Sequence, residues 1–130
     1  GLIIGSDQVA ALDERILTKP GGHAAALEQL RASSGRTVVF RTGLALVDAT
    51  DGRREVTCVA CEVTFRALSD AEIERYLALE APWDAAGSIR SEGYGIALFE
   101  RIQGDDPTAL VGLPLIHLRR MLADFGLPLP

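Results

Sequence analysis

Residues 37–66, TVVFRTGLALVDATDGRREVTCVACEVTFR, set the architecture of this chain. Both halves of the stretch are rich in β-branched and apolar residues, which is typical of strands. Between them, Thr50-Asp51-Gly52-Arg53 contains the Asp-Gly pair that favours a tight reversal of the chain. The sequence therefore predicts a long antiparallel hairpin, with strands at residues 37–49 and 54–66.

Further helices and strands are expected on both sides of the hairpin. Before it, the sequence predicts an apolar strand at residues 1–5, buried on both faces and central in its sheet, and a helix at 23–32. After it, Ser69 to Glu72 form a capping box that opens a helix to about Leu79. Three more segments complete the order: a loop at 80–95, a strand at 96–103 and a helix from Pro114 to a stop at Gly126. This alternation predicts an α/β domain built on a mixed sheet.

Composition narrows the class of protein. The chain has 130 residues, of which 48% are hydrophobic and 24% charged, as expected for one globular domain over residues 1–130. No apolar run approaches the ~20 residues that cross a bilayer, so we expect a soluble protein without a membrane partner. The net charge of −5 argues against binding a nucleic acid polymer. The negative net charge does not exclude a small anionic ligand that local Lys or Arg side chains and a divalent metal would hold.

The two cysteines, Cys58 and Cys61, form a C-x-x-C pattern inside the second predicted strand. Residues three apart on a strand point to opposite faces, so the two thiols should diverge rather than share a metal. His23 and His117 are too few and too scattered to complete a zinc site. Two reduced thiols favour a cytoplasmic location.

Three segments could carry chemistry. Asp7 follows the first predicted strand, where a carboxylate could hold Mg²⁺ or orient a water, although such a residue is as often part of a turn. Lys19 precedes Gly21-Gly22 and a helix, an arrangement that suits an anion or an ordinary loop. Glu92 lies in the glycine-rich loop 86–95, which could be a binding loop or a solvated one.

Taken in chain order, these pieces resemble the Maf (septum formation inhibitor) family. The resemblance covers essentially the whole chain, and its blocks are collinear. They are IGSDQV (4–9), ILTKP (16–20), VTFRAL (63–68), AGS (86–88), IQGD (102–105) and VGLPL (111–115).

The resemblance implies a nucleoside triphosphate pyrophosphatase, which cleaves between the α and β phosphates with a divalent cation such as Mg²⁺ or Mn²⁺. It implies an elongated α/β domain like that of the inosine-triphosphate pyrophosphatases, commonly a homodimer. Asp7 resembles the family's proton acceptor and metal-associated carboxylate, and Lys19 its phosphate-contacting lysine. Gln8 and Glu92 fall at the positions that sort the family by nucleobase.

The pair Gln8 and Glu92 resembles the branch of the family that acts on 7-methyl-GTP, in nucleotide-pool house-cleaning. In the branch acting on dTTP and UTP, a Thr tends to follow the Asp and a Gln takes the later position. The alternatives are a pyrophosphatase of pyrimidine or broad preference, or a non-catalytic, division-regulating module or inactive fragment. The family's first strand and its Ser-x-Ser-Pro-Arg-Arg-like phosphate loop are not in this chain, so the resemblance implies an N-terminally incomplete domain.

Overall fold

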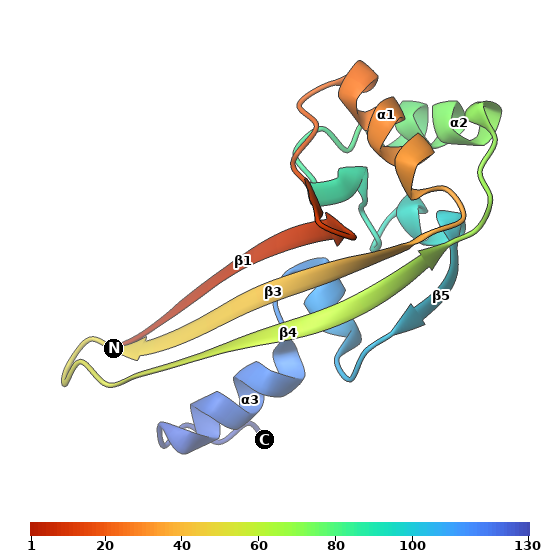
Figure 1. Ribbon diagram of the computed structural model, residues 1–130. Helices are drawn as coiled ribbons and strands as arrows, with labels where there is room; N and C mark the ends of the chain where they lie inside the picture. The colour runs from red at the N-terminus through yellow and green to blue at the C-terminus, as the bar shows by residue number, and fades with distance from the viewer. The chain divides into compact units, whose positions relative to one another are not determined.

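The structure, a computed structural model, describes residues 1–130 and contains a five-stranded sheet, three α-helices and three short 3₁₀ helices (Figure 1). The strands are β1 (Leu2–Leu12), β2 (Arg15–Leu17), β3 (Thr37–Asp48), β4 (Arg54–Phe65) and β5 (Phe99–Gln103). The α-helices are α1 (His23–Ser33), α2 (Asp70–Glu80) and α3 (Leu115–Asp124). The 3₁₀ helices are η1 (Ala86–Ser88), η2 (Tyr94–Leu98) and η3 (Pro107–Val111).

The chain divides into two compact units. Unit 1 comprises Gly1–Gln8, Arg41–Cys61 and Gly104–Pro130, and unit 2 comprises Val9–Phe40 and Glu62–Gln103. The strands β1, β3 and β4 each contribute residues to both units, whereas α3 belongs to unit 1 and the helices α1 and α2 belong to unit 2.

The strand order is β2-β1-β3-β4-β5. Ala10 of β1 pairs with Leu17 of β2, Val63 of β4 pairs with Ile102 of β5, and both pairs of strands are antiparallel. The arrows of β1, β3 and β4 alternate in direction in Figure 1, so the sheet is antiparallel. The α/β class is confirmed, but the expected mixed sheet is wrong. Short turns join β1 to β2 and β3 to β4, and short turns can join only antiparallel neighbours.

The first strand differs from its prediction in length and in burial. It continues past Gly5 to Leu12 and reverses at Asp13, whose φ of 53° is left-handed, into β2. Ala10 is fully buried, but Ile3 and Ile4 are 58% and 46% exposed. The prediction that β1 is buried on both faces is therefore wrong near the start of the strand. In unit 1, α3 is the helix that packs on strands.

In unit 1 the predicted hairpin and the predicted last helix form one core. Leu44 and Leu46 of β3 pack against Leu118, Met121 and Leu122 of α3. Arg53, in the hairpin turn, places its guanidinium 4.3 Å from the centre of the Phe125 ring and donates a hydrogen bond of 2.9 Å to the Asp124 carbonyl. This contact ties the tip of the hairpin to the end of α3, which stops just before Gly126 as predicted.

In unit 2 the helices α1 and α2 lie beside each other (Figure 1). The predicted capping box of α2 is confirmed, because Ser69 Oγ accepts from the Glu72 N–H and Glu72 Oε1 accepts from the Ser69 N–H, at 3.2 and 2.9 Å. The predicted loop is confirmed over residues 81–93, between α2 and η2, and it contains η1. Because η2 occupies Tyr94–Leu98, β5 starts at Phe99 and not at the predicted residue 96.

Cys58 is exposed and Cys61 is buried, which confirms that the two thiols point to opposite faces of β4. No helix combines the length and the apolar character that crossing a bilayer requires.

Candidate functional site

Asp7 lies within β1, in unit 1, and not beyond the end of a strand as the sequence predicts. Its side chain is exposed, and Oδ1 accepts a hydrogen bond of 2.9 Å from the Gln8 N–H. A shallow pocket of about 300 Å³ opens beside it. The pocket is lined by Gly5, Ser6, Asp7, Gly43, Leu44, Ala45 and Val56. The carboxylate is therefore open to a ligand and has only one partner within the chain.

Gln8, the next residue, is half-buried and firmly held. Its side-chain nitrogen Nε2 donates to the Ala109 carbonyl at 3.0 Å, the Leu110 carbonyl at 3.1 Å and the Thr42 hydroxyl oxygen at 3.3 Å. Thr42 belongs to β3, and the two carbonyls belong to η3. Two elements that are distant in sequence thus fix one amide group of unit 1.

The helix η3 is itself fixed by Asp106, a fully buried carboxylate. The carboxylate accepts from the N–H groups of Thr108 at 3.0 Å and Ile116 at 2.9 Å, and it lies 3.5 Å from His117 Nδ1. Burial alone would raise the pKa of Asp106, but hydrogen bonds from Thr108 and Ile116, with His117 close by, hold this pKa below its ordinary value. Asp106 therefore stays ionised at neutral pH and supports the carbonyls that bind Gln8.

Lys19 is exposed in unit 2, in the loop between β2 and α1. The loop is held on both sides of Lys19. The Thr18 carbonyl accepts from Gln29 Nε2 at 2.9 Å and from the Gly87 N–H at 3.4 Å, and the Gly21 N–H donates to the Trp83 carbonyl at 2.8 Å. The helix α1 begins after Gly22 without a side-chain cap, so its first N–H groups are open to an anion.

Glu92 is also exposed in unit 2, in a turn whose backbone is well anchored. The Arg90 carbonyl accepts from the N–H groups of Gly93 at 3.2 Å and Gly95 at 3.0 Å, and the Tyr94 N–H donates to the Glu80 carboxylate. The Glu92 carboxylate itself has only a long contact of 3.5 Å from Ser91 Oγ. The chain thus holds the backbone of this turn while leaving the carboxylate available.

A buried polar chain connects the loops that carry Lys19 and Glu92. Gln29 bonds Thr18 with its nitrogen and accepts from Ser88 Oγ with its oxygen, at 2.6 Å. The Tyr76 hydroxyl donates to the Ser88 carbonyl at 2.7 Å and accepts from the Arg90 N–H at 3.1 Å. Burial raises the pKa of Tyr76 to about 12, so its hydroxyl keeps its proton and its role as donor.

Charges of both signs surround these loops. Arg90 pairs with Asp84 at 2.5 Å, and that carboxylate raises the pKa of Arg90, with smaller contributions from Glu80 and Glu92. Asp84 in turn has its pKa lowered, first by Arg90 and to a small extent by Lys19. Lys19 and Glu92 each make no close ion pair in the structure, so both charges are available to a ligand.

Neither Gln29 nor Tyr76 is among the site residues predicted from the sequence. For Gln29, the sequence does contain a signal of a buried polar role. Ala26, Gln29, Leu30 and Ser33 are the buried residues of α1, and they follow the spacing of an apolar helix face. A glutamine and a serine on such a face must find buried partners, which points to a polar network.

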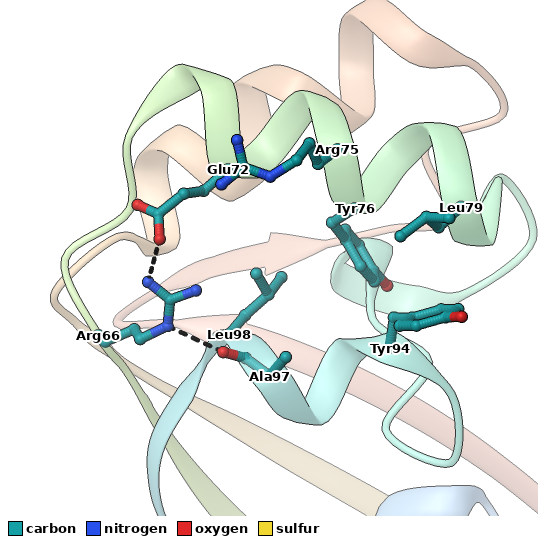
Figure 2. A pocket seen from close by; sticks show the side chains of 8 residues that line it. All are labelled: Arg66, Glu72, Arg75, Tyr76, Leu79, Tyr94, Ala97 and Leu98. Carbon is teal, nitrogen blue, oxygen red and sulfur yellow. Dashed lines mark hydrogen bonds and ion pairs between the residues drawn. The ribbon is translucent and has the colours of Figure 1, made fainter.

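Another pocket, in unit 2, is lined by none of the predicted site residues (Figure 2). Its volume is about 140 Å³, and Arg66 bridges it by donating to Glu72 Oε2 at 2.5 Å and to the Ala97 carbonyl at 2.8 Å. Hydrogen bonding by the Ser69 N–H, together with Arg66, lowers the pKa of Glu72 from 4.5 to about 2. Arg66 therefore ties α2 to η2 across this pocket.

In unit 2 the structure brings together the loops that carry Lys19 and Glu92. In unit 1, Asp7 and Gln8 are consecutive residues of β1, so their side chains point to opposite faces of the sheet, Asp7 beside the shallow pocket and Gln8 against Thr42 and η3. No group of three or more His, Cys, Asp or Glu side chains gathers as a ready metal site. The single exposed carboxylate of Asp7 fits Mg²⁺ or Mn²⁺ that arrives with phosphates, since Mg²⁺ is often bound by one or two carboxylates and the substrate.

Comparison with known proteins places the chain in a family. The family model for Maf-like proteins matches residues 1–125, and the chain belongs to that family. A protein of Cupriavidus pinatubonensis named 7-methyl-GTP pyrophosphatase is 56% identical over 127 residues, covering 98% of this chain and 64% of its own length. Proteins of the same name from Nitrosococcus oceani and Pseudomonas syringae are 54% and 53% identical, covering 98% and 99% of this chain and 64% and 67% of their own lengths. The chain thus spans about two thirds of the length of these curated relatives.

Proposed function

We propose that this protein is a nucleoside triphosphate pyrophosphatase that hydrolyses 7-methyl-GTP to 7-methyl-GMP and pyrophosphate. One observation carries the proposal: relatives of that name are 50% to 56% identical to the chain over nearly all of its residues. The exposed carboxylates and the lysine described above supply groups that such a reaction needs.

In the proposed reaction, the oxygen of a water molecule bonds to the α-phosphorus. The bond from that phosphorus to the α,β-bridging oxygen breaks, and pyrophosphate leaves with this oxygen. Asp7 accepts the proton that the water loses, and Lys19 offsets the negative charge of the phosphates. The exposure of both side chains and the absence of close ion pairs support these roles.

A divalent cation bound through Asp7 and the substrate would supply further charge neutralisation for the phosphates. Asp7 is the residue of this chain that we propose as its ligand, and Mg²⁺ or Mn²⁺ suits a carboxylate oxygen. As the resemblance implies, we propose that the enzyme acts as a homodimer, and we propose a cytoplasmic location from its reduced cysteines.

Glu92 is proposed to bind the base. Guanine presents its N1–H and its exocyclic amine as neighbouring donors, which a carboxylate can accept with two parallel hydrogen bonds. Methylation at N7 makes the base cationic, so an anionic partner should favour the methylated nucleotide. The availability of the Glu92 carboxylate, on a turn whose backbone is anchored, supports this role.

The reaction is tested with the protein expressed from its complete reading frame, in Asp7→Asn and in the matched control Asp124→Asn. Asp124 is an exposed aspartate at the end of α3 whose carboxylate makes no hydrogen bond. We expect Asp7→Asn to lower kcat for pyrophosphate release from 7-methyl-GTP by about 100-fold or more, with Mg²⁺ present, and Asp124→Asn to leave it unchanged. Near-normal turnover by folded Asp7→Asn would exclude Asp7 as proton acceptor.

A further inference from the structure

We propose that Arg90 binds the phosphates of the substrate together with Lys19, and that the Asp84 carboxylate faces both cations in the free protein, where it takes the place of an anionic ligand. The proposal rests on the proposed function, because it starts from Lys19 as a phosphate-binding residue. It adds a second cation to the phosphate site and makes Asp84 a competitor of the ligand within the chain.

The backbone sets the segment that carries Lys19 against the segment that carries Asp84. Two hydrogen bonds, of 3.4 and 2.8 Å, join the ends of segment 18–21 to the ends of segment 83–87. The first residue of each segment bonds to the last residue of the other, so the two run in opposite directions. Lys19 therefore lies across from the stretch that begins at Asp84. The pKa of Asp84 is lowered mainly by Arg90 and to a small extent by Lys19, which agrees with a carboxylate between two cations.

Asp84 and Arg90 form an ion pair that an incoming anion can replace. Asp84 Oδ1 lies 2.5 Å from a terminal nitrogen of Arg90, and the two side chains are 75% and 37% exposed. An ion pair this open to water contributes little, because both groups are well hydrated when they separate. A phosphate group carries more charge than a carboxylate and offers more acceptor oxygens, so it is the stronger partner for a guanidinium.

The backbone of Arg90 stays in place while its side chain changes partner. The N–H donates to the Tyr76 hydroxyl at 3.1 Å, and the carbonyl accepts from the N–H groups of Gly93 and Gly95. Only side-chain torsions of Arg90 therefore change when an anion replaces Asp84. Arg90 also lies two residues before Glu92, so one nucleotide can contact Glu92 with its base and Arg90 with its phosphates.

The first test measures the affinity for inorganic pyrophosphate by isothermal titration calorimetry, without a divalent cation, in the protein expressed from its complete reading frame. Asp84→Asn removes the competing charge, so we expect its Kd to fall about threefold, a size typical of an exposed ion pair. Damage to the fold would weaken binding, so a lower Kd separates competition from a merely structural role.

Asp70→Asn is the matched control, because Asp70 is also exposed in unit 2 and pairs with an arginine, Arg31, at 2.8 Å. This variant removes the same charge and the same kind of ion pair, and its Kd should equal that of the wild type. An unchanged or higher Kd in Asp84→Asn would overturn the proposal, as would an equal fall in the two variants. No measurable binding by the wild type and by Asp84→Asn would overturn it as well.

The second test removes the proposed phosphate-binding cation. We expect Arg90→Gln to raise the Kd for pyrophosphate about tenfold, since it removes charge-assisted hydrogen bonds. Arg31→Gln, which removes an equal charge elsewhere in unit 2, should leave the Kd within about twofold of the wild type. Equal affinities of Arg90→Gln and the wild type would overturn the assignment of Arg90.

Failure of the proposed function has a different signature. The wild type would then release no pyrophosphate from 7-methyl-GTP, while Asp84→Asn would still tighten and Arg90→Gln would still weaken the binding of pyrophosphate. Turnover of 7-methyl-GTP by the wild type, with a pyrophosphate affinity that neither variant changes, would overturn only the present proposal.

Discussion

Replacing Tyr76 by Phe removes a single oxygen atom from the centre of unit 2. This hydroxyl donates to the Ser88 carbonyl at 2.7 Å and accepts from the Arg90 N–H at 3.1 Å. The Tyr76 side chain is 3% exposed and Ser88 is fully buried. The Phe ring fits the same space, so the change isolates the contribution of the two hydrogen bonds.

The magnitude follows from the two groups that lose a partner. Arg90 is half-buried, so water can replace the hydroxyl as acceptor for its N–H. The Ser88 carbonyl is buried, and an unsatisfied buried group destabilises a protein by about 1–3 kcal/mol. We therefore expect Tyr76→Phe to lower the free energy of unfolding by about 2 kcal/mol. For a chain of this size, that corresponds to a fall in Tm of about 8 °C.

Urea unfolding, followed by circular dichroism, measures the loss, with Tyr94→Phe as the matched control. Tyr94 lines the same pocket (Figure 2), but it is 56% exposed and its hydroxyl makes no hydrogen bond. Tyr94→Phe should change the free energy of unfolding by less than about 0.5 kcal/mol. If the two variants lose stability equally, the polar chain through Tyr76 does not hold the loops as described.

Two further predictions concern the supports of the Glu92 turn and of α2. A Cβ atom on Gly95 would overlap the Arg90 carbonyl oxygen, so Gly95→Ala should lower the free energy of unfolding by about 1–3 kcal/mol in urea. Gly22→Ala, where φ is extended and the space is open, should change it by about 0.5 kcal/mol or less, and equal losses would contradict the packing. Glu72 has its pKa lowered from 4.5 to about 2, so its bonds stabilise the fold above pH 4.5 and are lost as the pH falls toward 2. Glu72→Gln should therefore flatten the dependence of stability on pH in this window, and acid titrations of the two proteins with the same slope would refute the assignment.

The elements that the sequence predicts correctly are those with strong local signals. The Asp51-Gly52 turn and the apolar runs around it define the hairpin, and the pair Ser69 and Glu72 defines the start of α2. These signals operate between residues close in sequence, so no tertiary contact is needed to read them. The extension of β1 to Leu12 and the strand β2 depend instead on pairing such as Ala10 with Leu17, which only the folded sheet selects.

The candidate site likewise contains residues with a local sequence signal and residues that only the folded chain brings near them. Asp7, Lys19, Gln8 and Glu92 stand out in the sequence by their motifs. The groups that hold these residues in place do not stand out in the sequence. For Gln8, the Thr42 hydroxyl lies 34 residues away along the chain and the Ala109 carbonyl lies 101 residues away. A backbone carbonyl has no side-chain signature at all. The groups that orient a functional residue are thus the part of the site that requires three-dimensional coordinates.

The most direct test of the central claim is the ratio of kcat/KM for 7-methyl-GTP to that for UTP, measured by pyrophosphate release in the wild type and in Glu92→Gln. We predict that the wild type prefers 7-methyl-GTP. Loss of the charge-assisted bonds in Glu92→Gln should lower the ratio by about tenfold or more, since such a bond contributes about 1.5–3 kcal/mol. A wild type that hydrolyses UTP as well as 7-methyl-GTP, or a ratio that Glu92→Gln leaves unchanged, would contradict the account.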